Sequence, residues 1–371
     1  MKKKRFMTLF AVMSAAFLVF LIFFNKSVKR TPLLADDGSS FEKGVVTGIT
    51  QDNIGEDGAR AGNQEVVVRI TSGKYKGQEF PATSTDGYLY GATCEVGTHV
   101  TVSVSAYKDN VLVNIYNYDR EPVLVAFLIC FAVLVILVGG RKGISAIVGL
   151  VYTFICVIFF YLPMLYIGFQ PILAAVITCF IVTWFTLVLL GGFSRKTMAA
   201  VVGTMAGCIF AGIIAMIFGS VMHLSSYNLD NIETLLYVEE NSSLQIGALL
   251  FSGILISSLG AVMDVAMSIA SSMTEINYHS PNLPFTELFK SGIHVGRDMM
   301  GTDVNTLVLA FVGNSTASLI CYYAYNMPRR QLMNSYFIGI QILQGLSGTF
   351  GVVLTVPLVS ITTAVLLKKR Y

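Results

Sequence analysis

A carboxylate interrupts a long apolar run of the sequence, where small residues recur at helical spacing. The run reads LLFSGILISSLGAVMDVAMSIASSM, and its small or polar positions are Gly253, Ser257, Gly260, Asp264, Ser268 and Ser271. An ionised side chain at membrane depth costs at least about 2.5–3.5 kcal/mol, so such a residue usually faces a bundle interior or a polar path. Asp264 is therefore the first candidate for ion-coupling chemistry.

Further polar residues continue the helical face that carries Asp264. Ser268, Ser271 and Glu275 follow it at offsets of 4, 7 and 11, which places all four on one side of a helix. The glycines and serine that precede Asp264 on this face allow another backbone to pack closely. The pattern predicts a polar contact between this helix and a neighbour.

The next apolar segment supplies partners for that contact. Arg297, Asp298, Asp303 and Asn305 crowd its predicted cytoplasmic end, and in an antiparallel hairpin Asn305 or Arg297 can pair with Asp264. A buried carboxylate with a movable partner is the minimum apparatus for a proton or cation relay, since burial favours the neutral acid and a nearby cation favours the anion. A static interhelical hydrogen bond, worth about 0.6–1.7 kcal/mol, is the other interpretation.

Five residues are thus ion-coupling candidates. They are Asp264, Asn305, Arg297, Ser268 and Asp298. Arg297 and Asp298 are expected at the cytoplasmic interface, where a long side chain keeps its charge in water.

The composition requires a membrane for these helices. The chain has 371 residues, 54% hydrophobic and only 13% charged, with a mean hydropathy of +0.68, whereas soluble domains carry about 25% charged residues. A spanning helix needs about 20 largely apolar residues. About eight such stretches are predicted, near 6–24, 122–140, 143–164, 170–192, 197–219, 246–270, 301–324 and 345–367. The expected fold is a polytopic α-helical membrane protein.

The basic residues predict its orientation. One side of the eight-span arrangement collects Lys2, Lys3, Lys4, Arg5, Arg141, Lys142, Arg195, Lys196, Lys290, Arg297, Lys368, Lys369 and Arg370. By the positive-inside rule this side is the cytoplasm, so both termini are expected inside. Arg329 and Arg330 fall on the other side, which is consistent with an interfacial or re-entrant helix within 325–344. The long apolar core of the first segment favours an uncleaved anchor over a signal peptide.

Between the first two spans the pattern changes to period-two alternation. The segments GVVTGIT, QEVVVRITS, TCEVGTHVTVSVSA and NVLVNIYNY alternate or nearly so, which predicts about five short strands in a small extracytoplasmic β-barrel or OB-like domain. Such a domain serves either as a binding module or as a cap over the bundle. The predicted organisation is an anchor helix over 1–30, the β domain over 31–121 and a membrane domain of about seven helices over 122–371.

Several function classes lack their signatures. The six cysteines and four histidines show no metal-ligand spacing, and no phosphate-binding or dinucleotide motif is present. No basic-aromatic stripe supports nucleic-acid binding, and no hydrolase or protease motif indicates an enzyme. We therefore expect no enzyme activity, cofactor, metal or nucleic-acid partner.

Two strings carry a resemblance to a known family. The strings GAVMDVAMSIASSMTEI (260–276) and SGIHVGRDMMGTDVNTLVLAFVGNS (291–315), preceded by NYDR (117–120) and GGRKGISAIVGL (139–150), resemble the YibE/F family of bacterial multi-span membrane proteins. The resemblance implies a bacterial plasma-membrane protein, described as a predicted permease, with no established activity. A homologous membrane partner or a homo-oligomer is plausible on the same ground. Asp303 departs from the family pattern, so the resemblance assigns it no role.

A fainter similarity is to the RND and SecD/SecF superfamily. There, an outward domain after the first span precedes a helix with an acidic motif that takes part in proton or sodium coupling, and here MDVAMSI (263–269) and DVNTL (303–307) stand in corresponding places. The leading hypothesis is a proton- or cation-coupled permease or export-assisting transporter of unknown substrate. The alternative is a non-transporting scaffold or sensor whose β domain binds a cell-envelope component.

Overall fold

The chain forms two compact units in the computed structural model. The structure describes residues 2–30, 39–54, 60, 62–85, 90–107 and 110–368. One unit comprises residues 1–31 and 135–371, and the other comprises residues 32–134. Of the residues used above, Lys369 and Arg370 lie outside the described residues, as does the 31–38 start of the predicted β domain.

The smaller unit is a closed five-stranded barrel, as the alternation predicts. Its strands are β1 (Ser39–Gln51), β2 (Gln64–Ile70), β3 (Glu79–Ser84), β4 (His99–Tyr107) and β5 (Asn110–Tyr118). They pair in the order β1-β2-β3-β5-β4, with β3 and β5 parallel and all other pairs antiparallel. Inward-facing valines and Ile70 fill the barrel because alternate residues of a strand face one side.

Two details of the barrel differ from the sequence pattern. The strand β3 contains Pro81 and was not among the alternating segments, yet it pairs with β2 along six residues. Thr93–Val96, within the predicted segment TCEVGTHVTVSVSA, lies outside any strand. Proline has no backbone N–H group to donate to a neighbouring strand. On the edge of β3 that faces β5, only two residue pairs form.

The larger unit consists of helices. They are α1 (Lys2–Ser27), α2 (Glu121–Cys156, beginning in the smaller unit), α3 (Leu162–Tyr166), α4 (Pro171–Gly191), α5 (Arg195–Val221), α6 (Ile232–Glu240), α7 (Leu249–His279), α8 (Phe285–Asn314), α9 (Thr316–Ala324), α10 (Arg329–Met333) and α11 (Tyr336–Lys368), with a π-helical turn over Val157–Tyr161. Within the described residues, six helices are long and apolar enough to span a membrane, or seven if one bent pair is a single span. The count of eight spans stays a prediction.

The difference in count arises partly at Gly140. The continuous helical stretch Glu121–Tyr166 has 46 residues, too many for one straight span. Gly140 has φ 53° and ψ −129°, a conformation that glycine adopts without a Cβ penalty. A Cβ at Gly143 would collide with the Val135 carbonyl oxygen, so the chain folds back between these residues. The predicted separation of 122–140 from 143–164 matches this break.

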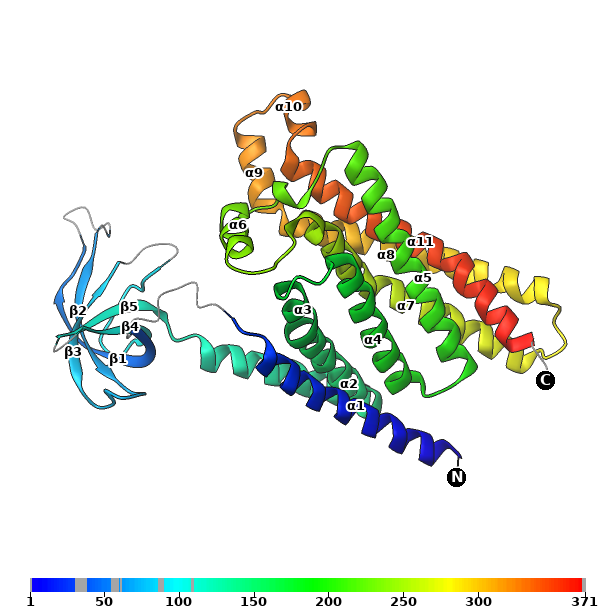
Figure 1. Ribbon diagram of the computed structural model, residues 1–371, viewed down its shortest axis with the longest axis horizontal. Coiled ribbons are helices and arrows are strands. Elements are labelled where there is room, and N and C mark those ends of the chain that lie inside the picture. Colours follow the sequence, from blue (N-terminus) through cyan, green and yellow to red (C-terminus); the bar gives the residue numbers. More distant parts are fainter. Residues whose placement is uncertain are drawn as a thin grey trace. The chain divides into compact units, whose positions relative to one another are not determined.

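Glycine contacts hold the central helices α5, α7, α8 and α11 together, and Figure 1 shows them side by side. A Cβ on Gly207 of α5 would collide with Thr355 Oγ1 of α11 and lie 2.8 Å from Val262 of α7. On α8, a Cβ on Gly292 would lie 2.5 Å from Met273 Sδ and 2.6 Å from Ser360 Oγ. Small residues thus let these backbones approach closely, as is typical of membrane helices.

The predicted span over 301–324 begins earlier in the structure and is bent. The helix α8 begins at Phe285, so Arg297 and Asp298 lie inside a helix and not in a connecting loop. It ends at Asn314, and α9 continues at an angle of 64°. Arg329 and Arg330 lie on the short α10, within the segment expected to be interfacial or re-entrant.

Candidate functional site

The helix α7 presents an unusual surface. Between Leu249 and Asn277 its exposed residues are Gly253, Ser257, Gly260, Asp264 and Glu275, and none is a large hydrophobic residue. The sequence pattern predicted this polar face correctly. Within the described part of the chain, however, nothing lies within 4 Å of a Cβ placed on Gly253 or Gly260, so no helix packs closely there.

The neighbouring long helices expose large hydrophobic side chains instead. The helix α5 exposes Ile209, Phe210 and Ile217, and α11 exposes Ile342 and Phe350. Lipid chains require an apolar surface, and polar groups in spanning segments usually face protein or water. The exposed face of α7 is therefore not suited to lipid.

Asp264 lies in the middle of this face and is exposed in the isolated chain. The buried carboxylate expected from the sequence is thus corrected to one that the described part of this chain leaves exposed, because no helix packs closely over the neighbouring Gly253 and Gly260. The side chain still lies halfway along a 31-residue helix, about 22 Å from its first residue. At that depth it requires a polar environment.

Asp303 of α8 is the acidic partner of Asp264. Asp303 interacts electrostatically with Asp264, and its Oδ2 atom is buried without a hydrogen-bond partner among the described residues. Packing explains the encounter: Gly296 of α8 contacts Ile269 of α7, and α7 and α8 form an antiparallel hairpin. Counting five residues from Ile269 toward the N-terminus of α7 reaches Asp264, and counting about five from Gly296 toward the C-terminus of α8 reaches the turn with Gly301 and Asp303. The two aspartates therefore lie at about the same level of the hairpin.

The predicted partners lie elsewhere. Asn305 is exposed and stands two residues beyond Asp303, about 200° around the helix axis. Arg297 and Asp298 are exposed nearer the start of α8, and Ser268 is half-buried one turn from Asp264. Among the described residues, neither Asn305 nor Arg297 forms a hydrogen bond or an ion pair with Asp264. The structure brings Asp264 together with Asp303.

Two carboxylates that interact across adjacent apolar helices have limited chemical options. Like charges in mutual range disfavour double ionisation, so such a pair holds a proton or binds a cation. Among the described residues, no Lys, Arg or His side chain forms an ion pair with either carboxylate, and α4, α5 and α11 carry none in their middle segments. Within the described residues, no group of three or more His, Cys, Asp and Glu side chains could hold a metal. A proton or a weakly held monovalent cation fits the pair.

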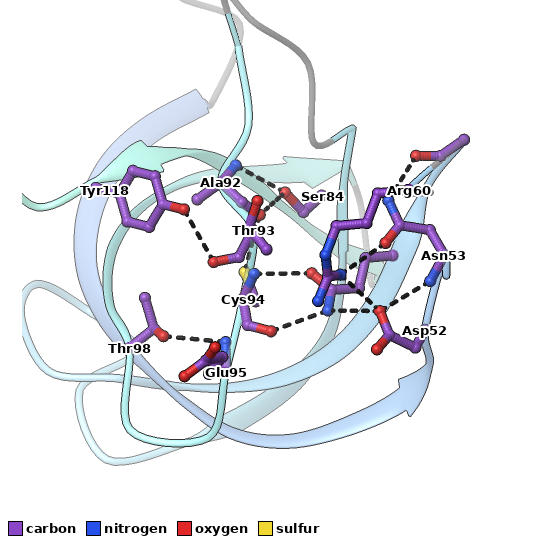
Figure 2. A network of polar contacts seen from close by, with 12 residues as sticks. Asp52, Asn53, Arg60, Ser84, Ala92, Thr93, Cys94, Glu95, Thr98 and Tyr118 are labelled. Atoms are coloured by element: carbon purple, nitrogen blue, oxygen red, sulfur yellow. Dashed lines mark hydrogen bonds and ion pairs between the residues drawn. The ribbon is translucent and has the colours of Figure 1, made fainter. Parts of the chain in front are cut away.

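The barrel contains the other polar network, shown in Figure 2. Buried Gln64 donates from Nε2 to the Cys94 carbonyl at 2.9 Å and accepts from the Cys94 amide at 2.8 Å. Ser84 makes the equivalent pair of bonds with the backbone of Ala92, at 2.7 and 2.9 Å. Arg60 donates to Asp52 at 2.8 Å. These partnered groups fix loops at one end of the barrel and leave little capacity for a ligand.

Comparison with known proteins identifies the helical part of the chain. A family model described as YibE/F-like protein matches residues 127–369. The chain belongs to the YibE/F-like family. The match covers both carboxylates and all helices from α3 to α11, whereas the strands of the barrel precede it. No curated protein and no solved structure matches the chain.

The family assignment confirms the resemblance drawn from the two sequence strings of this YibE/F-like protein. The fainter similarity to the RND and SecD/SecF superfamily is not shown. Sequence reasoning also missed the proximity of Asp303 to Asp264, although a signal existed. Leu288, Gly292 and Gly296 are buried on one face of α8. The residue seven positions after Gly296 lies on the same face, and that residue is Asp303, not Asn305.

Proposed function

We propose that this YibE/F-like protein is a proton- or cation-coupled permease or export-assisting transporter of the bacterial plasma membrane. Asp264 and Asp303 are its coupling pair. The observation that carries the proposal is the face of α7, which exposes small residues and a carboxylate where the other long helices expose large hydrophobic side chains. A polar path needs such a face, and lipid does not.

The two carboxylates have different roles in the proposed relay. The Oδ2 atom of Asp303 is enclosed and without a hydrogen bond among the described residues, so it has an open site for a proton. Asp264 is open to the exposed face and serves as the group that exchanges with the path. Loading neutralises the pair and removes repulsion between α7 and α8, while unloading restores it. This change in helix–helix interaction is the coupling step that we infer.

The other candidate residues lie along the same two helices, α7 and α8. Ser268 continues the α7 face toward the cytoplasmic end, and Asn305 lies on the exposed side of α8. Arg297 and Asp298 are exposed on the first half of α8, which the orientation predicted from the basic residues puts nearer the cytoplasm. The uncovered face also gives a homologous partner or a second copy a place to bind.

Ion flux in sealed vesicles tests the proposal. Wild type, Asp264→Asn and Asp303→Asn are compared at matched membrane abundance under an imposed pH or sodium gradient, with lumenal pH and sodium as readouts. Glu287→Gln is the matched control, because Glu287 is an exposed carboxylate in the first turn of α8, 3.1 Å from Lys290. We expect flux in wild type and in the control, and its loss in both aspartate variants.

The alternative function makes the opposite prediction. If the protein is a scaffold or sensor, removing either carboxylate changes its thermal stability but not the ion flux. Substitutions in the barrel then impair its function in the cell more than substitutions of the carboxylates do. Full flux in Asp264→Asn at normal abundance would eliminate the relay.

A further inference from the structure

An aromatic cluster lies exposed on the outside of the barrel. Phe41 of β1 and Tyr116 of β5 make an edge-to-face contact with ring centroids 5.0 Å apart, and Tyr90 lies 6.2 Å from Tyr116. Their exposed fractions are 62% for Phe41, 62% for Tyr90 and 45% for Tyr116. Aromatic side chains are costly to leave in water, so this cluster requires an account beyond the packing of the barrel.

The outward face of β5 extends the cluster toward the membrane. Tyr116 and Tyr118 of β5 are both exposed, and so is Arg120, which follows the strand. The Arg120 guanidinium lies 5.7 Å from the centre of the Tyr118 ring. Tyr118 also donates a hydrogen bond of 3.0 Å to the Thr93 carbonyl, which fixes its ring. The face thus combines rigid aromatic rings with an exposed cation.

The chain holds this face close to the start of a membrane helix. Tyr116 precedes Glu121, the first residue of α2, by five residues, a span of about 17 Å at most. Lys43, two residues after Phe41, forms ion pairs with Glu121 and with Asp119 at 2.5 and 3.6 Å. These contacts lie within one compact unit, so the barrel surface and the first turn of α2 are fixed to each other.

The position of α2 in a membrane then sets the level of the cluster. From Glu121 to the break at Gly140 the helix is about 28 Å long, close to the thickness of the hydrocarbon core. Val123, Leu124 and Phe127 are exposed and apolar from the first turn onward, which brings the hydrocarbon boundary to the beginning of the helix. Tyr116 therefore lies within about 17 Å of the start of the apolar stretch of α2, which is within reach of the headgroup layer.

We propose that the surface formed by Phe41, Tyr90, Tyr116, Tyr118 and Arg120 is an interfacial anchor that binds the lipid headgroup layer and seats the barrel on the membrane. Tyrosine concentrates at this level because its ring is apolar and its hydroxyl is polar. The arginine adds an attraction for lipid phosphates, which a guanidinium binds with two parallel hydrogen bonds. The inference is independent of transport by the helices.

Depth-dependent fluorescence quenching tests the anchor. The chain has a single tryptophan, Trp184, so a Trp184→Phe background carrying Phe41→Trp reports from the cluster alone in full-length protein in lipid nanodiscs. Tyr116→Trp in the same background is the second reporter, in case one variant folds poorly. Ile49→Trp is the matched control, since Ile49 is exposed on β1 eight residues beyond Phe41.

The expected result is a difference between reporters. Lipids brominated in the upper part of their chains should quench the Phe41 and Tyr116 reporters about two-fold more than the Ile49 control, and aqueous acrylamide should show the reverse order. Equal acrylamide quenching of all three, without quenching by brominated lipid, would overturn the proposal. Protection of the reporters by a soluble oligosaccharide in place of lipid would also overturn it and would make the surface a glycan platform.

Discussion

The bonds of Gln64 make a local prediction about the barrel. Gln64 is fully buried on β2, and its amide forms two hydrogen bonds with the Cys94 backbone. A third bond of 3.1 Å runs to Asp52 Oδ1. Gln64→Leu keeps a side chain of similar size but removes every one of these bonds. The loop that contains Cys94 should then open more often while the barrel stays folded.

The size of the effect follows from the groups that lose their partner. Leaving a buried donor or acceptor without its bond costs about 1–3 kcal/mol, so two such groups on Cys94 cost about 2–6 kcal/mol. Burying a leucine recovers about 1.5–2 kcal/mol of transfer free energy, so the midpoint of that cost, about 4 kcal/mol, leaves a net loss of about 2 kcal/mol. Since 1.4 kcal/mol is tenfold in an equilibrium, the Cys94 amide should exchange about 30-fold faster.

Hydrogen–deuterium exchange of the full-length protein measures this directly, because the Cys94 amide is itself the donor to Gln64 Oε1. Thr83→Val is the matched control: it removes a half-buried hydroxyl from β3 that donates to Glu65 at 2.9 Å, and it should change the exchange of Cys94 by less than about tenfold. Continued protection of β2 and β4 shows that the barrel is intact. A wild-type exchange rate at Cys94 in folded Gln64→Leu would refute the reasoning.

Two other changes have defined outcomes. Gly207→Ala should lower the thermal stability of the helical unit by about 1–3 kcal/mol, because its Cβ meets Thr355 of α11; Gly301→Ala, with nothing within 4 Å, is the control and should not destabilise. The bond to Glu121 raises the pKa of Lys43 above 10.5. The contribution of this pair to stability is therefore present below pH 10.5 and lost as the pH rises through the raised pKa. The difference in urea midpoint between wild type and Lys43→Gln should shrink in that range, whereas a constant difference would contradict the assignment.

The sequence predicted the barrel from its alternation, and it missed what alternation does not encode. The runs in β1, β2, β4 and β5 alternate because one face of each strand packs inside the barrel. The strand β3 has only six residues and includes Pro81, so its pattern is too short to distinguish from a loop. Its place between β2 and β5 is set by pairing with distant residues, which no local pattern contains.

The polar face of α7 was predicted from the sequence, whereas the proximity of Asp303 to Asp264 was not. The face of α7 was readable because small and polar residues repeat with helical spacing across Gly253, Ser257, Gly260 and Asp264. On α8 the choice between Asp303 and Asn305 depends on which side of the helix meets α7. The glycines at 292 and 296, which contact α7 and α11, decide in favour of Asp303.

The two units of the protein differ in a way that bears on function. The YibE/F-like match covers residues 127–369, which include Asp264, Asp303 and the exposed face of α7, and it begins after the barrel strands end at Tyr118. A chemistry common to the family must therefore reside in the helices, because the barrel is not part of what defines the match. The anchor proposed for the aromatic surface of the barrel is independent of that chemistry, because its residues precede the matched region.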